Sequence, residues 1–162
     1  MSGIKVFISH QKQDSEKAIW VQNYLKTNHG IECYLDVIDL DFEKGEEIAD
    51  YVRKELDKCS HFLVVMSSAT KNSWWVPWEI GVATEKDYPL ASYGDNVALP
   101  EFLMKWPYLR SSFDLKKYAE AIKETKVSSG FSLEDNISES VTASSGSSTK
   151  QFYRTLRSKL GQ

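Results

Sequence analysis

The 162-residue sequence has few cysteines and no histidine cluster, and this bears on its compartment and its chemistry. Its only cysteines, Cys33 and Cys59, do not form a Cys-x-x-Cys pair. They are expected to be free thiols in a reducing compartment. His10, His29 and His61 are scattered without the spacing of zinc ligands. The sequence therefore predicts no metal site.

Long apolar runs and a basic excess are also missing. The longest purely apolar run covers residues 62–66, far short of the roughly 20 residues that span a bilayer. The first residues lack a basic stretch followed by an apolar one, so we expect no signal peptide. Twenty basic and 23 acidic residues give a net charge of −3, which argues against nucleic-acid and anionic-membrane binding. We expect a cytoplasmic protein.

Two common phosphate-binding loops are missing as well. The sequence contains no Gly-x-x-x-x-Gly-Lys-Ser/Thr loop, and no Gly-x-Gly-x-x-Gly follows the first predicted strand. Both loops hold phosphates with glycine backbone amides at a helix start. A phosphate cradle of either kind is not expected.

Apolar patterns along the chain predict strands that alternate with helices. Short β-branched runs predict strands over residues 4–10, 31–37 and 61–67, with two further extended pieces within 88–99. Helical spacing predicts helices over 15–28, 46–57, 73–85 and 113–126, the first of them capped by Asp14. This order predicts a doubly wound parallel α/β sheet of four or five strands. Its functional crevice is expected at the carboxyl ends of the strands.

The chain divides into three parts by composition. Residues 1–127 carry the strands and helices of the predicted domain. Residues 128–149 are rich in serine with little apolar periodicity, which is typical of a flexible linker. Residues 150–162 are interpreted as a short basic helix or tail that docks on the domain, binds a partner or frays. We expect the domain to fold without residues 128–162.

Three of the five tryptophans fall within residues 74–78, at the start of a predicted helix. Trp75 and Glu79 are four residues apart and share one face of that helix. A structural interpretation makes the tryptophans core residues and the glutamate a partner of the helix dipole. A functional interpretation is that a carboxylate beside an indole orients a sugar and accommodates a flat ring.

Four segments in order carry a family resemblance. They are Val6–His10, Tyr34–Asp36 with the acidic loop that runs on to Gly45, Phe62–Ser67 and Ser73–Glu79. Together they resemble a bacterial-type TIR (Toll/interleukin-1 receptor) domain over roughly residues 4–126. Two later stretches, Leu99–Leu103 and Trp106–Leu109, are also similar to prokaryotic members.

The resemblance implies a TIR fold, a flavodoxin-like open parallel sheet with helices on both faces, and an activity. Many bacterial TIR domains cleave the nicotinamide–ribose bond of NAD+, releasing ADP-ribose or a cyclic form of it, often in anti-phage defence. NAD+ is then a substrate, and no cofactor is expected. Their catalytic glutamate lies in a Trp-x-x-x-Glu motif, which Trp75 and Glu79 match.

The resemblance also implies substrate-binding residues and partners. Ser9 and His10 match the end of the first strand, which lines the nucleotide site in these enzymes. Asp36 and residues 37–45 match the BB loop, through which TIR domains self-associate; a separate activating or effector protein is the other expected partner. Some relatives carry a basic residue two positions before the loop glycine. Here that residue is Glu43, with Lys44 next to the glycine, so the residue that meets the pyrophosphate stays open.

Three functions are therefore compared. The first is an NAD+ glycohydrolase or cyclase, in which Glu79 stabilises the cationic transition state. The second is a TIR interaction module without catalysis, and the third is an enzyme similar to nucleoside deoxyribosyltransferases, which also act on an N-glycosidic bond with a glutamate. An intact Trp75 and Glu79 pair favours the first, because a scaffold has no chemical need for that carboxylate.

Overall fold

The computed structural model describes residues 3–35, 45–73, 75–94, 98–135 and 141–162. Its five strands are β1 (Lys5–His10), β2 (Glu32–Leu35), β3 (His61–Val65), β4 (Leu90–Tyr93) and β5 (Tyr108–Leu109). Its helices are α1 (Ser15–His29), α2 (Gly45–Asp57), α3 (Trp75–Glu85), α4 (Ser112–Asp135) and α5 (Val141–Leu160). Three single 3-10 turns, η1 (Lys12–Asp14), η2 (Thr70–Asn72) and η3 (Glu101–Leu103), lie between them.

All neighbouring strands of the sheet are parallel, in the order β2-β1-β3-β4-β5. This order confirms the predicted doubly wound sheet and is that of flavodoxin-like folds. The chain passes from β1 outward to β2 and then returns to β3 on the other side of β1. The strand order therefore reverses between β1 and β3, and ligands of open α/β sheets bind at the carboxyl ends of such a pair.

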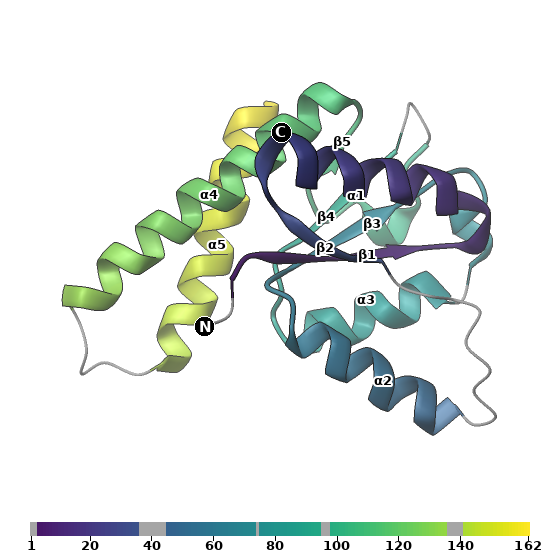
Figure 1. Cartoon of the computed structure of the whole chain (residues 1–162), viewed down its shortest axis with the longest axis horizontal. Helices are drawn as coiled ribbons and strands as arrows, with labels where there is room; N and C mark the ends of the chain where they lie inside the picture. The colour runs from purple at the N-terminus through teal and green to yellow at the C-terminus, as the bar shows by residue number, and fades with distance from the viewer. Residues whose placement is uncertain (1–2, 36–44, 74, 95–97, 136–140) are drawn as a thin grey trace.

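The two faces of the sheet have separate apolar cores, as Figure 1 shows by the helices above and below the strands. Val6 and Ile8 of β1 pack with α1, α4 and α5, whereas Phe7 packs with α2 and α3. Side chains of a strand point alternately to its two faces, which explains this division. The alternation also sends Ser9 to the α3 face, with Phe7.

The last strand differs from the sequence prediction. Two extended pieces were expected within residues 88–99, but the structure has only β4 in the described part of that span, and the fifth strand is Tyr108–Leu109. A strand of two residues is too short to show any alternation in the sequence. It is recognised by its pairing with Ser92 and Tyr93 of β4.

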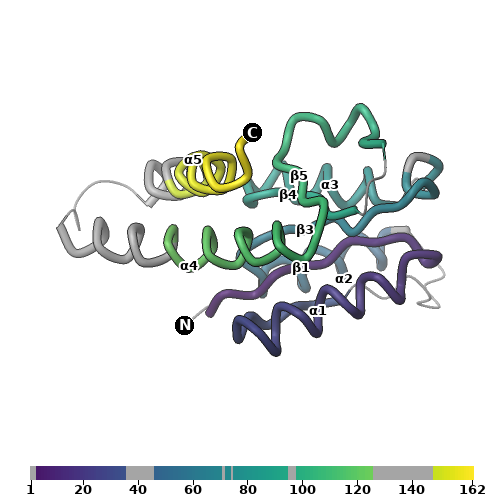
Figure 2. The backbone as a smooth tube through the Cα atoms, turned by 90° about the horizontal axis from the view of Figure 1, so that it is seen from above, coloured from purple at the N-terminus to yellow at the C-terminus, as the bar shows by residue number. Residues whose placement is uncertain are grey.

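The C-terminal region also differs from the prediction of a linker over residues 128–149. Helix α4 continues to Asp135, and α5 begins at Val141. The two helices lie side by side in both views, next to the end of the sheet where β1 begins (Figures 1 and 2). Phe152 and Leu156 of α5 are fully buried in the core shared with α1 and α4. This burial confirms docking as the outcome for residues 150–162, and it provides the energy that a docked helix needs.

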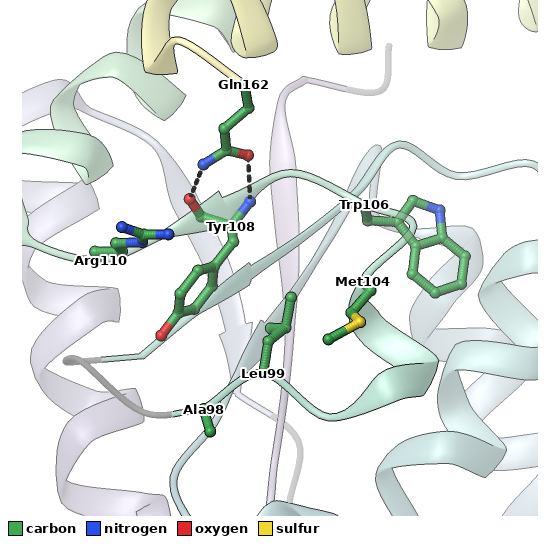
Figure 3. A pocket seen from close by; sticks show the side chains of 7 residues that line it. All are labelled: Ala98, Leu99, Met104, Trp106, Tyr108, Arg110 and Gln162. Carbon is green, nitrogen blue, oxygen red and sulfur yellow. Dashed lines mark hydrogen bonds between the residues drawn. The ribbon is translucent and has the colours of Figure 1, made fainter.

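The side chain of Gln162 forms hydrogen bonds with the backbone of edge strand β5. The side-chain amide of Gln162 accepts a hydrogen bond from the Tyr108 N–H at 3.1 Å and donates one to the Tyr108 carbonyl at 2.7 Å (Figure 3). These are the two bonds that a neighbouring strand would make, so the amide substitutes for a peptide group on edge strand β5. Gln162 also lines a hollow of about 570 Å³ with Leu99, Met104 and Trp106.

Candidate active site

The candidate site lies where β1 and α3 meet at the carboxyl end of the sheet. The Ser9 hydroxyl donates a hydrogen bond of 2.7 Å to Oε1 of Glu79, and both residues are fully buried. Ser9 is in register with Val64 of β3, so the pair lies at the reversal between β1 and β3. The structure thus brings together two predicted site residues that are 70 positions apart in the sequence.

Glu79 lies in the second turn of its helix, beyond the first turn in which a partner of the helix dipole is expected. Helix α3 begins at Trp75, which puts Glu79 in the second turn, and the first turn holds no acidic residue. The helix dipole acts mainly within the first turn. The Ser9 hydroxyl therefore contacts this carboxylate directly, whereas the helix end lies a turn away.

Two indole rings of α3 pack against each other in the turn that leads to Glu79. The ring centroids of Trp75 and Trp78 are 5.4 Å apart, at an angle of 34°. Both side chains are half-buried and pack against the core of the α3 face. Trp75 lies four residues before Glu79 and shares its helix face, as predicted. A partly accessible aromatic ring and a carboxylate on one helix face suit a ligand with a ring and hydroxyl groups.

Of the other predicted site residues outside the loop, the structure describes His10 and not Asp36. Strand alternation places His10, which is 3% exposed, on the α1 face with Ile8, opposite to Ser9. Asp36, Lys44 and all but the last residue of the predicted loop 37–45 lie outside the described residues. Their roles stay predictions.

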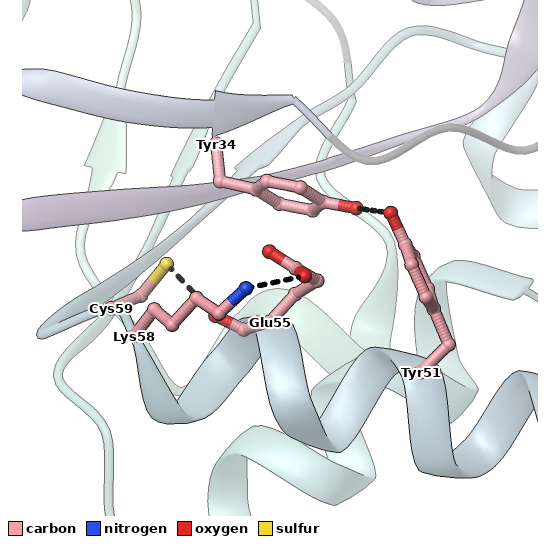
Figure 4. Close-up of polar contacts among 5 residues, drawn as sticks. All are labelled: Tyr34, Tyr51, Glu55, Lys58 and Cys59. Carbon is pink, nitrogen blue, oxygen red and sulfur yellow. Dashed lines mark hydrogen bonds and ion pairs between the residues drawn. The ribbon is translucent and has the colours of Figure 1, made fainter.

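A hydrogen bond connects β2 and α2, the elements before and after residues 36–44. The Tyr34 hydroxyl of β2 donates a hydrogen bond of 2.8 Å to the Tyr51 hydroxyl of α2 (Figure 4). Near the end of α2, Lys58 donates to Glu55, whose carbonyl accepts from Cys59 (Figure 4). The strand before this segment and the helix after it are therefore held at a set distance.

Asp14 has a different role from the helix cap that the sequence predicted. Its carboxylate makes no capping bond to α1. Instead, the Thr70 hydroxyl donates to Oδ2 of Asp14 at 3.4 Å, and both residues are buried. Sequence reasoning missed Thr70 as a partner, although both residues follow adjacent parallel strands, whose carboxyl-end loops lie side by side.

The two cysteines and His61 are buried groups whose pKa values are shifted away from neutrality. Burial raises the pKa of Cys33 to about 12 and that of Cys59 to about 11, so both thiols stay protonated at neutral pH. Burial lowers the pKa of His61, at the start of β3, to about 4. Among the described residues, no three His, Cys, Asp or Glu side chains gather as they would around a metal ion.

Comparison with known proteins identifies the family. The family model of the TIR domain matches residues 6–124. This chain belongs to the TIR domain family. The match covers all five strands, α1 to α3 and the first half of α4, and it confirms the resemblance seen in the sequence. Helix α5 lies outside it.

One curated relative is a protein of Bacillus cereus (strain MSX-D12) described as a probable 3' cyclic ADP-D-ribose synthase, ThsB'. It is 27% identical over 128 residues, which are 72% of this TIR chain and 66% of the relative. The chain thus spans slightly less than two thirds of that protein's length.

Two solved structures are similar to the TIR chain. The TIR domain of the Toll-related receptor TRR-2 from Hydra magnipapillata is 18% identical, with a TM-score of 0.48 over 64% of this chain and 82% of that one. The TIR domains of the activated Roq1 resistosome, which recognises the pathogen effector XopQ, are 17% identical. Their TM-score is 0.46 over 96% of this chain and 84% of that one. No described helix of the TIR chain is long and apolar enough to cross a bilayer.

Proposed function

We propose that this protein cleaves NAD+ between nicotinamide and ribose, yielding nicotinamide and either ADP-ribose or a cyclic form of it. One observation carries the proposal: a buried carboxylate, Glu79, accepts a hydrogen bond from Ser9 at the strand reversal of the sheet, one helical turn after Trp75. The description of the Bacillus cereus relative as a probable cyclase supports the same class of reaction.

The chemistry requires one carboxylate. Nicotinamide in NAD+ is cationic, so it leaves without protonation and takes the electron pair of the broken C–N bond. Positive charge develops on the ribose, and a fixed anion nearby stabilises it. The Glu79 carboxylate provides that charge and can also orient the ribose hydroxyls. Water then attacks the sugar to give ADP-ribose, or a nucleophile of the same molecule attacks it to give a cyclic product.

The remaining substrate contacts extend this proposal. Trp75 would stack against a ring of the substrate, and Ser9 would hold Glu79. His10, Asp36 and Lys44 would contact the nucleotide, as the family resemblance implies. A cytoplasmic role in antiviral defence or signalling belongs to the proposal on the same ground.

The burial of Glu79 connects the activity to assembly. The Glu79 side chain has no exposed surface in the single chain, and a substrate must contact it to react. We therefore propose that the active form is reached by self-association through residues 37–45 or by binding of a separate activating protein.

A product assay tests the proposal. NAD+ is incubated with the full chain over a hundredfold range of protein concentration, and nicotinamide, ADP-ribose and cyclic products are separated by chromatography. We expect cleavage whose specific activity rises steeply with protein concentration. Constant specific activity from a monomeric sample would overturn the role of assembly. Release of free bases from nucleosides, with NAD+ left intact, would favour the deoxyribosyltransferase-like alternative.

An interaction module without catalysis is the second candidate, and one observation favours it. Ile19 and Trp20 of α1 and Phe113 of α4 are 48%, 45% and 63% exposed. Exposed apolar side chains of this size are typical of surfaces that bind proteins. Light scattering on the same samples distinguishes the candidates, because a module assembles without consuming NAD+.

A further inference from the structure

Two buried hydroxyl–carboxylate contacts connect the β1–α1 segment to the β3–α3 segment. In the first, a hydroxyl of β1 (Ser9) donates to a carboxylate of α3 (Glu79). In the second, the direction is reversed: a hydroxyl of the β3–α3 connection (Thr70) donates to a carboxylate just before α1 (Asp14). Both contacts lie where the strand order reverses between β1 and β3.

Thr70 organises the segment that leads into α3. Its hydroxyl oxygen accepts a hydrogen bond from the Ser67 N–H at 2.9 Å, while the Thr70 N–H donates to the Ser67 carbonyl at 3.1 Å. The Thr70 carbonyl in turn accepts from the Ser73 N–H at 3.0 Å. The hydroxyl thus accepts from Ser67 with one lone pair and donates its proton to Oδ2 of Asp14.

Ser73 connects the Thr70 segment to the first turn of α3. Its hydroxyl accepts from the Val76 N–H in the first turn of α3 at 3.2 Å. One turn later, Glu79 meets Ser9 at 2.7 Å. A series of hydrogen bonds therefore connects Asp14, through Thr70 and Ser73, to the helix that carries Trp75 and Glu79.

The packing of α1 does not explain why the Asp14 carboxylate is buried. The residue is 6% exposed, makes no capping bond to α1, and contacts the Thr70 hydroxyl at 3.4 Å. That distance is long for a hydroxyl–carboxylate bond, whereas a buried carboxylate is costly to retain. Because the buried Asp14 carboxylate does not cap α1, we expect it to act on the segment that it contacts through Thr70.

We propose that Asp14 and Thr70 are positioning residues for the NAD+ cleavage proposed above, on which this inference rests. They hold residues 67–73, and through them they set the placement of Trp75 and Glu79 against the ribose. Neither residue is proposed to touch the substrate. Small displacements of a catalytic group have large effects on turnover, about 100-fold for 1 Å.

The test removes one hydroxyl and restores it. Thr70→Val keeps the shape of the side chain, and Thr70→Ser returns the hydroxyl. The matched control is Thr125→Val: Thr125 is also buried, and its hydroxyl donates to the Ala121 carbonyl in α4 at 2.7 Å. We expect Thr70→Val to lower kcat about 10- to 100-fold with KM within about threefold. Thr70→Ser should stay within about threefold of the wild type, and Thr125→Val should leave kcat unchanged.

A second measurement does not depend on activity. Amide hydrogen exchange without substrate should speed up over residues 67–80 in Thr70→Val and not in Thr125→Val. Faster exchange with unchanged kcat, or an equal loss of kcat in both valine variants, would overturn the positioning role. A wild-type protein that leaves NAD+ intact in the assembled state would overturn the proposed function and with it this role. The exchange data would then report separately whether the contact holds the segment.

Discussion

The two ends of the parallel sheet bury different kinds of side chains. At the carboxyl end, a carboxylate and a hydroxyl are buried together as Glu79 and Ser9. At the amino end, α5 covers the starts of the strands with apolar and aromatic side chains, and Phe152 contacts the His61 ring of β3 at 5.1 Å between centroids. Burying apolar surface stabilises a fold, whereas burying polar groups costs stability unless they are paired.

This difference separates function from stability along the sheet. A substitution at the carboxyl end should change activity more than stability, and one at the amino end should do the reverse. Substitutions at the two ends with the same relative effects on activity and stability would contradict this difference.

The largest expected effect is on turnover at the carboxyl end. Glu79→Gln keeps an oxygen that can accept from Ser9 but removes the negative charge. If that charge stabilises the cationic transition state, kcat should fall by roughly 10²–10³ or more. The free energy of unfolding should change by no more than about 1 kcal/mol, since the hydrogen bond to Ser9 is kept. Product chromatography and thermal unfolding measure the two quantities; wild-type turnover by a folded variant would refute the role of Glu79.

The largest effect on stability is expected at the amino end. Phe152→Ala leaves a cavity in the core of the α1 face and should lower the free energy of unfolding by about 3–5 kcal/mol. The control is Phe113→Ala, which removes a ring that is 63% exposed and should cost less than about 1 kcal/mol. Denaturant unfolding measures both changes, and NAD+ cleavage per folded molecule should be unchanged in Phe152→Ala.

The same packing reverses one expectation from the sequence. The composition of residues 128–162 predicted that the domain would fold without them. Because Phe152 and Leu156 belong to the core, we now expect a chain without these residues to lose its cooperative unfolding transition. A truncated chain with the wild-type transition would show that α5 contributes little.

The amino end should also make stability depend on pH. Burial lowers the pKa of His61 from 6.5 to about 4. Between these values the unfolded chain binds a proton that the folded chain does not, so stability falls as pH decreases from 6.5 to 4. The contribution of His61 is at most about 1.4 kcal/mol per pH unit. His61→Gln cannot titrate and should flatten the curve in denaturant unfolding; an unchanged slope would contradict the assignment.

The smallest effect compares two tyrosines next to Phe152. The Tyr153 hydroxyl accepts from the Leu90 N–H at 3.0 Å, whereas the buried Tyr118 hydroxyl has no hydrogen-bond partner among the described residues. Tyr153→Phe leaves the Leu90 N–H without its acceptor and should cost about 1–3 kcal/mol. Tyr118→Phe removes an unsatisfied group and should be neutral or slightly stabilising. A loss in Tyr118→Phe as large as that in Tyr153→Phe, in the same unfolding experiment, would contradict this difference.

Several features could be predicted because they depend on residues close together in the chain. The runs of residues 4–10 and 61–67 are continuous and β-branched, which identified β1 and β3 as buried parallel strands. The spacing of Trp75 and Glu79 placed both on one face of α3. The position of Ser9 at the end of the first strand directed attention to the edge of the sheet where the structure places its contact with Glu79.

Other features required the tertiary structure, because they depend on which distant segments meet. Asp14 has the residue type of a helix cap, yet its carboxylate faces Thr70, 56 positions later. For residues 150–162 the sequence left docking, partner binding and fraying open, and the fully buried Phe152 ring decides for docking on the domain. Local sequence determines propensity and periodicity, whereas burial and long-range partners are decided only when the strands are ordered side by side. The family resemblance placed Ser9 and Glu79 in one site, but the physical cause of their contact is tertiary, since the reversal at β1 and β3 joins them.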